Sequence, residues 1–449
     1  MRMSMYEWDV TDIRKRLCHA LDISAQTVEQ LAQSGYTDAL APANNLRPEK
    51  VISETALLLL AASGASRYPE VKGRIYQVAL QLAPYARSER MLLGVCLEPA
   101  VAVDYAQAHI CLSRMGFPDE DFDRVLRQSL RSQAASGRER PPHRMLEQLW
   151  FDDLRLTPTV RSRSAANRLA KQSLLCLPMD LLKGSREDIY AFTHALLYIN
   201  RFHHFPLRLP RRRSDILAEA AGLLARCLDN EDYDLSGELL LAWPLTHNSW
   251  SVSATFGFHV LARVEDAAGF LPAPTTRLGQ IDKLEGNARL KYLLATAYHT
   301  VYVMGLLCSA ALLPGCAPPA RIPVAGAIPD AASRILNHLS VDTLSIHWCE
   351  VFRLLDNRER DALAGFLLEV ALFRCVKKHD FESLHRVLEA GYLCGLVSSP
   401  VASQAAEMLQ RLTALNRIDG DQPAPGAGVT PLQGTPPLSD SSLQSIGAY

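Results

Sequence analysis

Apolar residues at helical spacing recur along this 449-residue chain, and this pattern constrains its fold more than any other feature. Between residues 8 and 34, for example, Val10, Ile13, Leu17 and Leu21 fall on one side of a helix. Similar segments follow one another, separated by Pro- and Gly-containing turns, and no convincing alternation typical of a strand interrupts them. The sequence therefore predicts an all-α fold of stacked helical hairpins, with an α/α toroid-like array as one form, and no consensus of a named repeat family.

Shifts in composition divide the chain into regions. We expect an N-terminal helical region at 1–135, a basic connector at 136–185, a central helical block with the candidate site at 186–313, a Pro/Gly linker at 314–329, C-terminal helices at 330–417 and a tail at 418–449. The tail is rich in Gly, Pro, Ser, Asp and Gln and has few large apolar residues, so it cannot offset the entropy of ordering and should be disordered.

Charge is balanced over the whole chain but not along it. The formal net charge is -1, so only local patches favour a nucleic-acid or membrane partner. Residues 124–171 hold eleven Lys and Arg residues against four Asp and Glu, a local charge of +7. This stretch fits contact with phosphate-rich RNA or an acidic partner, and it equally fits a solvated surface whose charge is balanced by acids nearby in the fold.

Cysteine spacing and apolar run lengths bear on the compartment. The ten cysteines form no CxxC pair, which favours free thiols in a reducing environment over a disulfide framework or a structural zinc site. Residues 1–16 lack the apolar core of a signal peptide, and runs such as 55–62 are too short for a bilayer. We expect a cytoplasmic protein with no membrane partner.

Two apolar helical segments carry histidine beside tyrosine. His194 shares a helix face with Tyr190 and Tyr198, and His299 has Tyr298 beside it and Tyr302 three residues on. We predict that both segments line one cavity, with His194 and His299 as general acid or base and Tyr198, Tyr298 and Tyr302 as substrate-binding residues. The alternative is that the imidazoles are hydrogen-bonded core groups and the tyrosines core aromatics.

Acidic residues open the helix between these segments. Asp234 and Glu238 lie one turn apart and are predicted to orient a histidine or bind a substrate ammonium group, although acids at a helix start are also favoured by the helix dipole. The signature of a helical-bundle metal site, a Glu-x-x-His segment on each of two facing helices, is missing, and His247 and His259 lack ligand spacing, so we expect no metal. No phosphate-binding glycine motif or nucleophile elbow occurs, and we expect no cofactor.

Several of these segments resemble a family of poorly characterised actinobacterial proteins encoded beside natural-product genes, among them the seryl-tRNA-dependent seryl transferase of valanimycin biosynthesis. The resemblance rests on residues 232–246, 256–266, 269–274 and 297–307, and more weakly on 45–62. It implies transfer of serine from seryl-tRNA to a hydroxylamine. It supplies no defined catalytic motif, so no site residue is taken from it.

Two classes of function follow. The first is a natural-product enzyme, an aminoacyltransferase whose partners are charged tRNA and a small amine or hydroxylamine. Such an enzyme needs no ATP site, and Arg208, Arg211, Arg212 and Arg213 would contact the tRNA. The second is a non-catalytic helical scaffold or small-ligand-binding protein. The sequence does not give the oligomeric state.

Overall fold

The computed structural model describes residues 10–34, 48–156, 158–203, 206–339, 346–396 and 398–420. Within these ranges the chain forms helices and turns and no β-strand, which confirms the predicted all-α fold. Its contacts separate two units, Met1–Glu407 and Met408–Tyr449, and everything below concerns the first. The predicted disordered tail lies outside the described residues beyond Gly420, where the last helix ends.

The first half of the chain contains α1 (Val10–Ser34), α2 (Pro48–Ala62), α3 (Pro69–Ala86), α4 (Glu89–Leu97), α5 (Ala102–Arg114), α6 (Glu120–Ser129), α7 (Pro142–Arg155), α8 (Val160–Ala170) and α9 (Arg186–Asn200). The second half contains α10 (Arg213–Asp229), α11 (Tyr233–Leu240), α12 (Ala242–Leu245), α13 (Val252–Ala268), α14 (Leu278–Ile281), α15 (Gly286–Ala311), α16 (Ala331–Leu336), α17 (Ile346–Leu354), α18 (Asn357–Ala362), α19 (Ala364–Lys378), α20 (Phe381–Leu393) and α21 (Pro400–Gly420).

Local sequence explains where several of these helices begin and end. Pro48, Pro69 and Pro142 each occupy a first helical position, where the missing N–H costs nothing. Pro244 lies in the short α12 that follows α11 directly. It is tolerated there because it falls within the first turn.

Consecutive helices pack against each other in pairs, which confirms the stacked hairpins. Contacts join α2 with α3, α4 with α5, α7 with α8, α10 with α11 and α19 with α20. The predicted basic connector contains α7 and α8, and α7 also packs on α5 and α9. No helix occurs in the predicted linker at 314–329.

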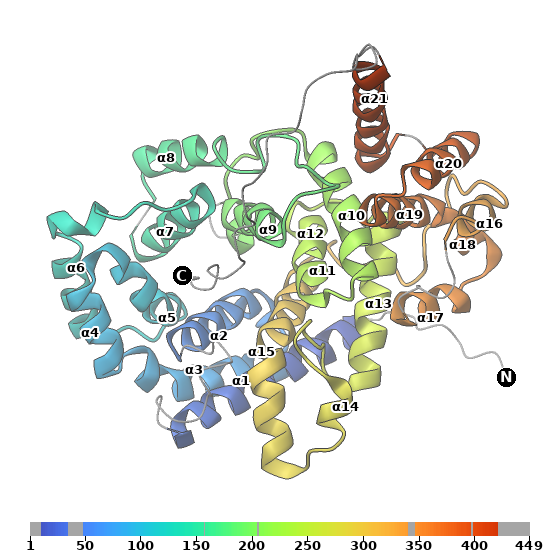
Figure 1. Ribbon diagram of the computed structural model, residues 1–449. Coiled ribbons are helices and arrows are strands. Elements are labelled where there is room, and N and C mark those ends of the chain that lie inside the picture. Colours follow the sequence, from blue (N-terminus) through green and yellow to red (C-terminus); the bar gives the residue numbers. More distant parts are fainter. Residues whose placement is uncertain are drawn as a thin grey trace, which may run out of the picture. The chain divides into compact units, whose positions relative to one another are not determined.

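A closed ring of helix contacts organises the part of the chain that carries the candidate site. Starting from α15, contacts run through α2, α5, α7, α9 and α11 and return to α15. Figure 1 shows these six helices around the middle of the view. Residues that are far apart in the sequence therefore face one interior.

Two glycines let α15 approach its neighbours closely. A Cβ at Gly305 would lie 2.8 Å from Ala20 of α1 and 2.8 Å from Leu58 of α2. A Cβ at Gly237 of α11 would lie 2.6 Å from Val303 of α15. Larger residues at either position would push helices of the ring apart.

α15 is long and apolar enough to cross a membrane by length and composition, as is the bent pair of α4 with residues 99–114. In α15, however, 78% of the apolar window is buried inside the protein. Burial of this kind is typical of the central helix of a soluble fold.

Candidate functional site

One face of α9 lines the ring with aromatic and polar side chains. Ser185 begins α9 with a capping box that it shares with Asp188. Tyr190, His194 and Tyr198 then follow at one-turn intervals, and the His194 ring meets the two tyrosine rings edge-on at 5.6 and 5.8 Å. The helical spacing read from the sequence thus places these three rings on one surface.

The short helix α11 supplies the carboxylates. Asp232 is its N-cap and accepts a hydrogen bond from the backbone N–H of Leu235. Asp234 and Glu238 follow one turn apart and are only 4% and 7% exposed. Buried carboxylates require partners, and each of these two has them on both sides.

The outer oxygens of this pair are held by neighbouring helices. Oδ2 of Asp234 accepts hydrogen bonds from the Tyr190 hydroxyl and, at 3.1 Å, from the Arg186 guanidinium. Oε2 of Glu238 accepts from the Thr193 hydroxyl at 2.5 Å. Both carboxylates are therefore fixed in orientation by α9.

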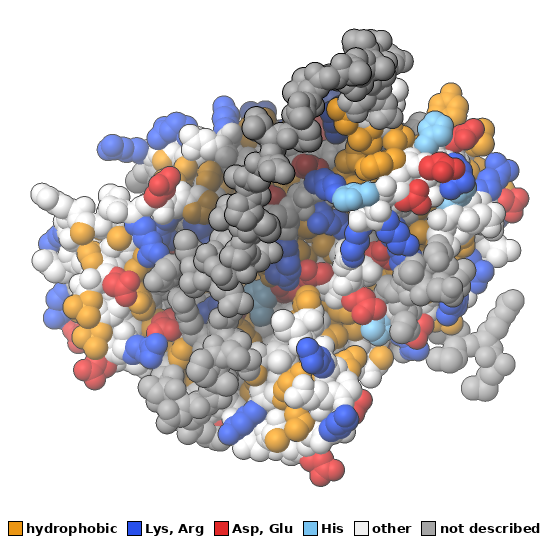
Figure 2. Space-filling model, viewed as in Figure 1, with side chains coloured by type: hydrophobic (Ala, Val, Ile, Leu, Met, Phe, Trp, Pro, Cys, Tyr) orange, Lys and Arg blue, Asp and Glu red, His pale blue; other side chains and the backbone are white. Residues whose placement is uncertain are grey.

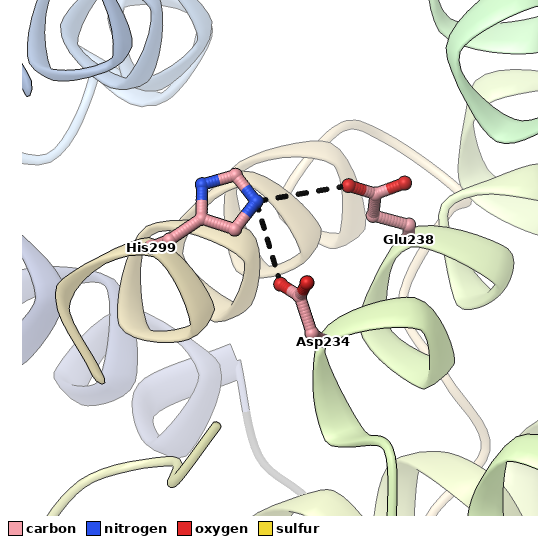
Figure 3. Close-up of side chains that lie close together, drawn as sticks. All are labelled: Asp234, Glu238 and His299. Carbon is pink, nitrogen blue, oxygen red and sulfur yellow. Dashed lines mark ion pairs between the residues drawn. The ribbon is translucent and has the colours of Figure 1, made fainter. Parts of the chain in front are cut away.

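The inner oxygens face His299 of α15 (Figure 3). Nε2 of His299 lies 3.4 Å from Oδ1 of Asp234 and 3.9 Å from Oε1 of Glu238. On the other side of the ring, Nδ1 lies 3.1 Å from Oε2 of Glu54, which comes from α2. Nε2 of His194 approaches the same Glu238 oxygen at 3.5 Å. The predicted residues His194, Asp234, Glu238 and His299 thus meet in one place.

Mutual charge dominates the protonation of this cluster. Burial opposes protonation of His299, but Glu54 and Asp234 outweigh it and raise its pKa well above the usual value. Burial likewise opposes ionisation of Glu54, yet the charge on His299 lowers its pKa to about 2. Glu238 has a lowered pKa because both imidazoles outweigh its burial. For Asp234, burial and the nearby Glu238 charge raise the pKa against the pull of His299.

Solvent reaches the cluster despite this burial. The side chains of His194 and His299 are 23% and 28% exposed. Figure 2 shows this face of the molecule hollowed over the meeting point of α9 and α11, with histidine, acidic and basic side chains gathered in the hollow. A small polar molecule therefore has access to both imidazoles.

The three predicted substrate-binding tyrosines are less open to the hollow. Tyr198 is 3% exposed and donates its hydroxyl to Glu147 at 2.6 Å. Tyr302 is 2% exposed and its hydroxyl lies 2.9 Å from that of Thr55. Tyr298 is 6% exposed and stands edge-on to Tyr302. Each forms part of the wall behind the histidines.

The four predicted tRNA-contacting arginines divide into two groups. Arg208, Arg212 and Arg213 are exposed. Arg211 instead donates to both carboxylate oxygens of Glu219 and, at 2.7 Å, to the carbonyl oxygen of Leu175. Its guanidinium stabilises the fold, which argues against a phosphate contact.

Glu54 and Thr193 were not predicted as site residues from the sequence, and Tyr190 was identified there only as a neighbour of His194. Glu54 lies on α2, far from the central block in sequence, and nothing in its surroundings distinguishes it from a solvated acid. Thr193 precedes His194 on α9 and gives a detectable signal only in retrospect, as a polar residue on an apolar helix.

The geometry also changes our expectation about metal binding. Asp234, Glu238 and His299 each offer one ligand atom, and these atoms lie within 4.8 Å of one another. No sequence spacing could show this group, because His299 comes 61 residues after Glu238 and from another helix.

Comparison with protein families places the chain. Residues 19–309, more than half of its length, match a family described as a domain of unknown function (DUF6895). The chain belongs to this family. The DUF6895 match begins within α1 and ends within α15, so it contains every helix of the ring and the cluster of Glu54, His194, Asp234, Glu238 and His299. Comparisons with curated proteins and with solved structures found no match.

Proposed function

We propose that this DUF6895 protein is a cytoplasmic enzyme of natural-product biosynthesis. In this proposal it transfers an aminoacyl group, seryl in the first instance, from charged tRNA to a small amine or hydroxylamine. The observation that carries the proposal is that two partly exposed imidazoles share one buried carboxylate, Glu238, at the base of a hollow. The resemblance described above supplies the reaction class.

The chemistry needs few groups because the aminoacyl ester is already activated. The nitrogen or oxygen of the acceptor attacks the ester carbonyl, and its proton passes to a base. Collapse of the tetrahedral intermediate breaks the bond to the ribose oxygen, which takes the proton back. Holding both reactants in the hollow supplies much of the rate enhancement.

His194 is the better placed base of the two histidines. Its ring borders the hollow, and Glu238 at 3.5 Å can orient it and stabilise the imidazolium that forms. His299 has carboxylates on both ring nitrogens, so in this proposal it stays charged and holds Asp234 and Glu238 in place. The negative charge of Asp234 and Glu238 attracts the ammonium group of the aminoacyl substrate.

Exposed basic side chains on the same unit provide a surface for the tRNA phosphates. α8 contains no acidic residue and exposes Arg163, Arg168 and Lys171 along a shallow groove. Several other arginines of the predicted basic stretch are paired with acids, as Arg140 is with Asp104 and Arg155 is with Asp152. We therefore place the phosphate contacts on α8 and on Arg208, Arg212 and Arg213.

The test is transfer of labelled serine from seryl-tRNA to an alkylhydroxylamine. We expect His194→Gln to lower kcat/KM by roughly 10²–10⁴-fold, the usual contribution of a general base. The matched control is His385→Gln, an exposed histidine on α20 that should leave turnover unchanged.

Binding provides the second readout. Charged tRNA should bind at low salt and weaken steeply as salt rises, and removal of the α8 cations should reduce both the affinity and the salt slope. Absence of tRNA binding at low salt would refute the proposal. Amine binding without transfer from any charged tRNA would instead identify a non-catalytic ligand-binding protein.

A further inference from the structure

We propose that Asp234, Glu238 and His299 bind one divalent transition-metal ion of the Zn²⁺, Fe²⁺ or Mn²⁺ class. This inference goes beyond the proposed function, because it rests on the arrangement of the side chains and holds whichever reaction the protein catalyses.

The donor atoms have the separations that a metal site requires. Bonds of about 2.1 Å in a tetrahedral arrangement put neighbouring ligand atoms about 3.4 Å apart. Nε2 of His299 lies 3.4 Å from Oδ1 of Asp234 and 3.9 Å from Oε1 of Glu238. All three ligand atoms lie within 4.8 Å of one another, so the two carboxylates and the imidazole would close in on an ion as it bound.

Each ligand is also held from behind through its other polar atom. Tyr190 fixes Oδ2 of Asp234, Thr193 fixes Oε2 of Glu238, and Glu54 faces Nδ1 of His299. A carboxylate on the distal nitrogen of a ligating histidine is the usual outer contact of such sites, where it fixes the tautomer and raises the basicity of the ring. The three inner atoms are left facing one another (Figure 3).

The inner oxygen of Asp234, Oδ1, lacks a hydrogen bond within the part of the chain that the structure describes. Asp234 is 4% exposed, and its Oδ1 has no hydrogen-bond partner among the described residues. Among the described residues, the 3.4 Å ion pair with His299 is what offsets the cost of burying this oxygen, and a metal cation bound at this point would add a stronger interaction.

The donor set selects the class of ion. Two carboxylate oxygens and one imidazole nitrogen suit Zn²⁺, Fe²⁺ or Mn²⁺, whereas Ca²⁺ and Mg²⁺ prefer oxygen ligands alone. His194 contacts the same Glu238 oxygen at 3.5 Å from the side of the hollow. With an ion bound, His194 would lie beside it on the side open to solvent, and the neutral amino group of a substrate would bind the ion instead of pairing with Asp234.

The experiment measures metal uptake by the full chain without any substrate. Protein treated with chelator is dialysed against Zn²⁺, Mn²⁺ or Co²⁺, the bound metal is quantified, and the Co²⁺ absorption spectrum reports the ligands. We expect one equivalent per chain. Asp234→Asn and His299→Gln should each weaken binding at least 100-fold, and Thr193→Val, which removes only an outer contact, should weaken it about 10- to 100-fold.

The control is a double variant, His385→Gln with Glu389→Gln. These two exposed residues lie one turn apart on α20. These changes should leave uptake at one equivalent. Thr193→Val guards against misfolding as an explanation, because it preserves the volume and charge of the site. If wild-type protein takes up no more metal than the His299→Gln variant, the proposal is wrong. Protonated His299 would then be the positive charge that interacts with both Asp234 and Glu238.

This outcome is separable from that of the proposed transfer. Serine transfer by a protein that takes up no metal would sink the metal site and leave the transferase standing. One tightly bound equivalent of metal in a protein that transfers no serine would support the metal site and refute the transferase.

Discussion

Replacing Gly237 by alanine tests the close approach of α11 to α15 that sets the distances in the site. Gly237 lies between Asp234 and Glu238 on α11. A Cβ there would lie 2.6 Å from Cγ1 of Val303 and 3.6 Å from Cδ2 of Leu261. The first separation is too short for any real contact, and a β-branched side chain in a helix has little freedom to move away.

Two opposing effects determine the size of the change. Alanine in place of glycine stabilises a helix interior by about 1 kcal/mol, whereas overpacking a core costs roughly 1–3 kcal/mol. We therefore expect Gly237→Ala to lower the free energy of unfolding by up to about 2 kcal/mol. In a Val303→Ala background the clashing methyl group is gone, and the nearest remaining atom of residue 303 is its Cβ at 3.8 Å. The same Gly237→Ala change should then stabilise the protein by about 1 kcal/mol.

The assay is urea unfolding followed by circular dichroism on wild type, both single variants and the double variant. Val303→Ala alone should cost about 2 kcal/mol, because it removes two buried methyl groups. The coupling energy between the two sites should reach about 1–3 kcal/mol in favour of the double variant. Equal effects of Gly237→Ala in both backgrounds, within about 0.5 kcal/mol, would refute the close contact. Metal affinity should fall in the single Gly237 variant and recover in the double variant.

Three further predictions concern other parts of the structure. Arg211→Gln should destabilise the protein by roughly 3–5 kcal/mol in urea unfolding, because it leaves the buried Glu219 carboxylate unpaired. An unchanged stability would contradict this structural role and favour Arg211 as a tRNA contact again. Burial raises the pKa of Glu369 to about 8, so the folded state holds a proton that the unfolded chain releases, and the free energy of unfolding should fall as pH rises from about 4.5 to 8. Glu369→Gln should reduce the slope of this fall by the equivalent of up to one proton. Parallel pH profiles for the variant and the wild type would contradict this prediction. Tyr302→Phe removes a buried hydrogen bond to Thr55 and should lower the free energy of unfolding by about 1 kcal/mol in thermal unfolding. Metal uptake and serine transfer should stay unchanged, and selective loss of either would support Tyr302 as the predicted substrate contact.

Periodicity was enough to predict the helices, because burying an apolar stripe is a local requirement written into residue spacing. The helical spacing between residues 8 and 34, for example, is matched by α1, Val10–Ser34. Helix spacing also placed Tyr190, His194 and Tyr198 on one face.

The site could be predicted only in part. His194, His299, Asp234 and Glu238 were found because each is a polar residue in an apolar helical segment, and such residues need partners. Their mutual distances could not be predicted, because these depend on how α9, α11 and α15 pack. For the same reason, the pairing of Arg211 with Glu219 could not be predicted.

The sequence alone determined that this is an all-helical protein and which polar residues must find buried partners, since both follow from local spacing and the cost of burying polar groups. The tertiary structure decided which partners they find. A ring of six helices brings Glu54 from α2 to His299 and sets His299 against Asp234 and Glu238. Electrostatic and metal-binding chemistry depends on separations of a few ångströms between residues that come from different helices and lie far apart in the sequence, and only the packing of the helices fixes those separations.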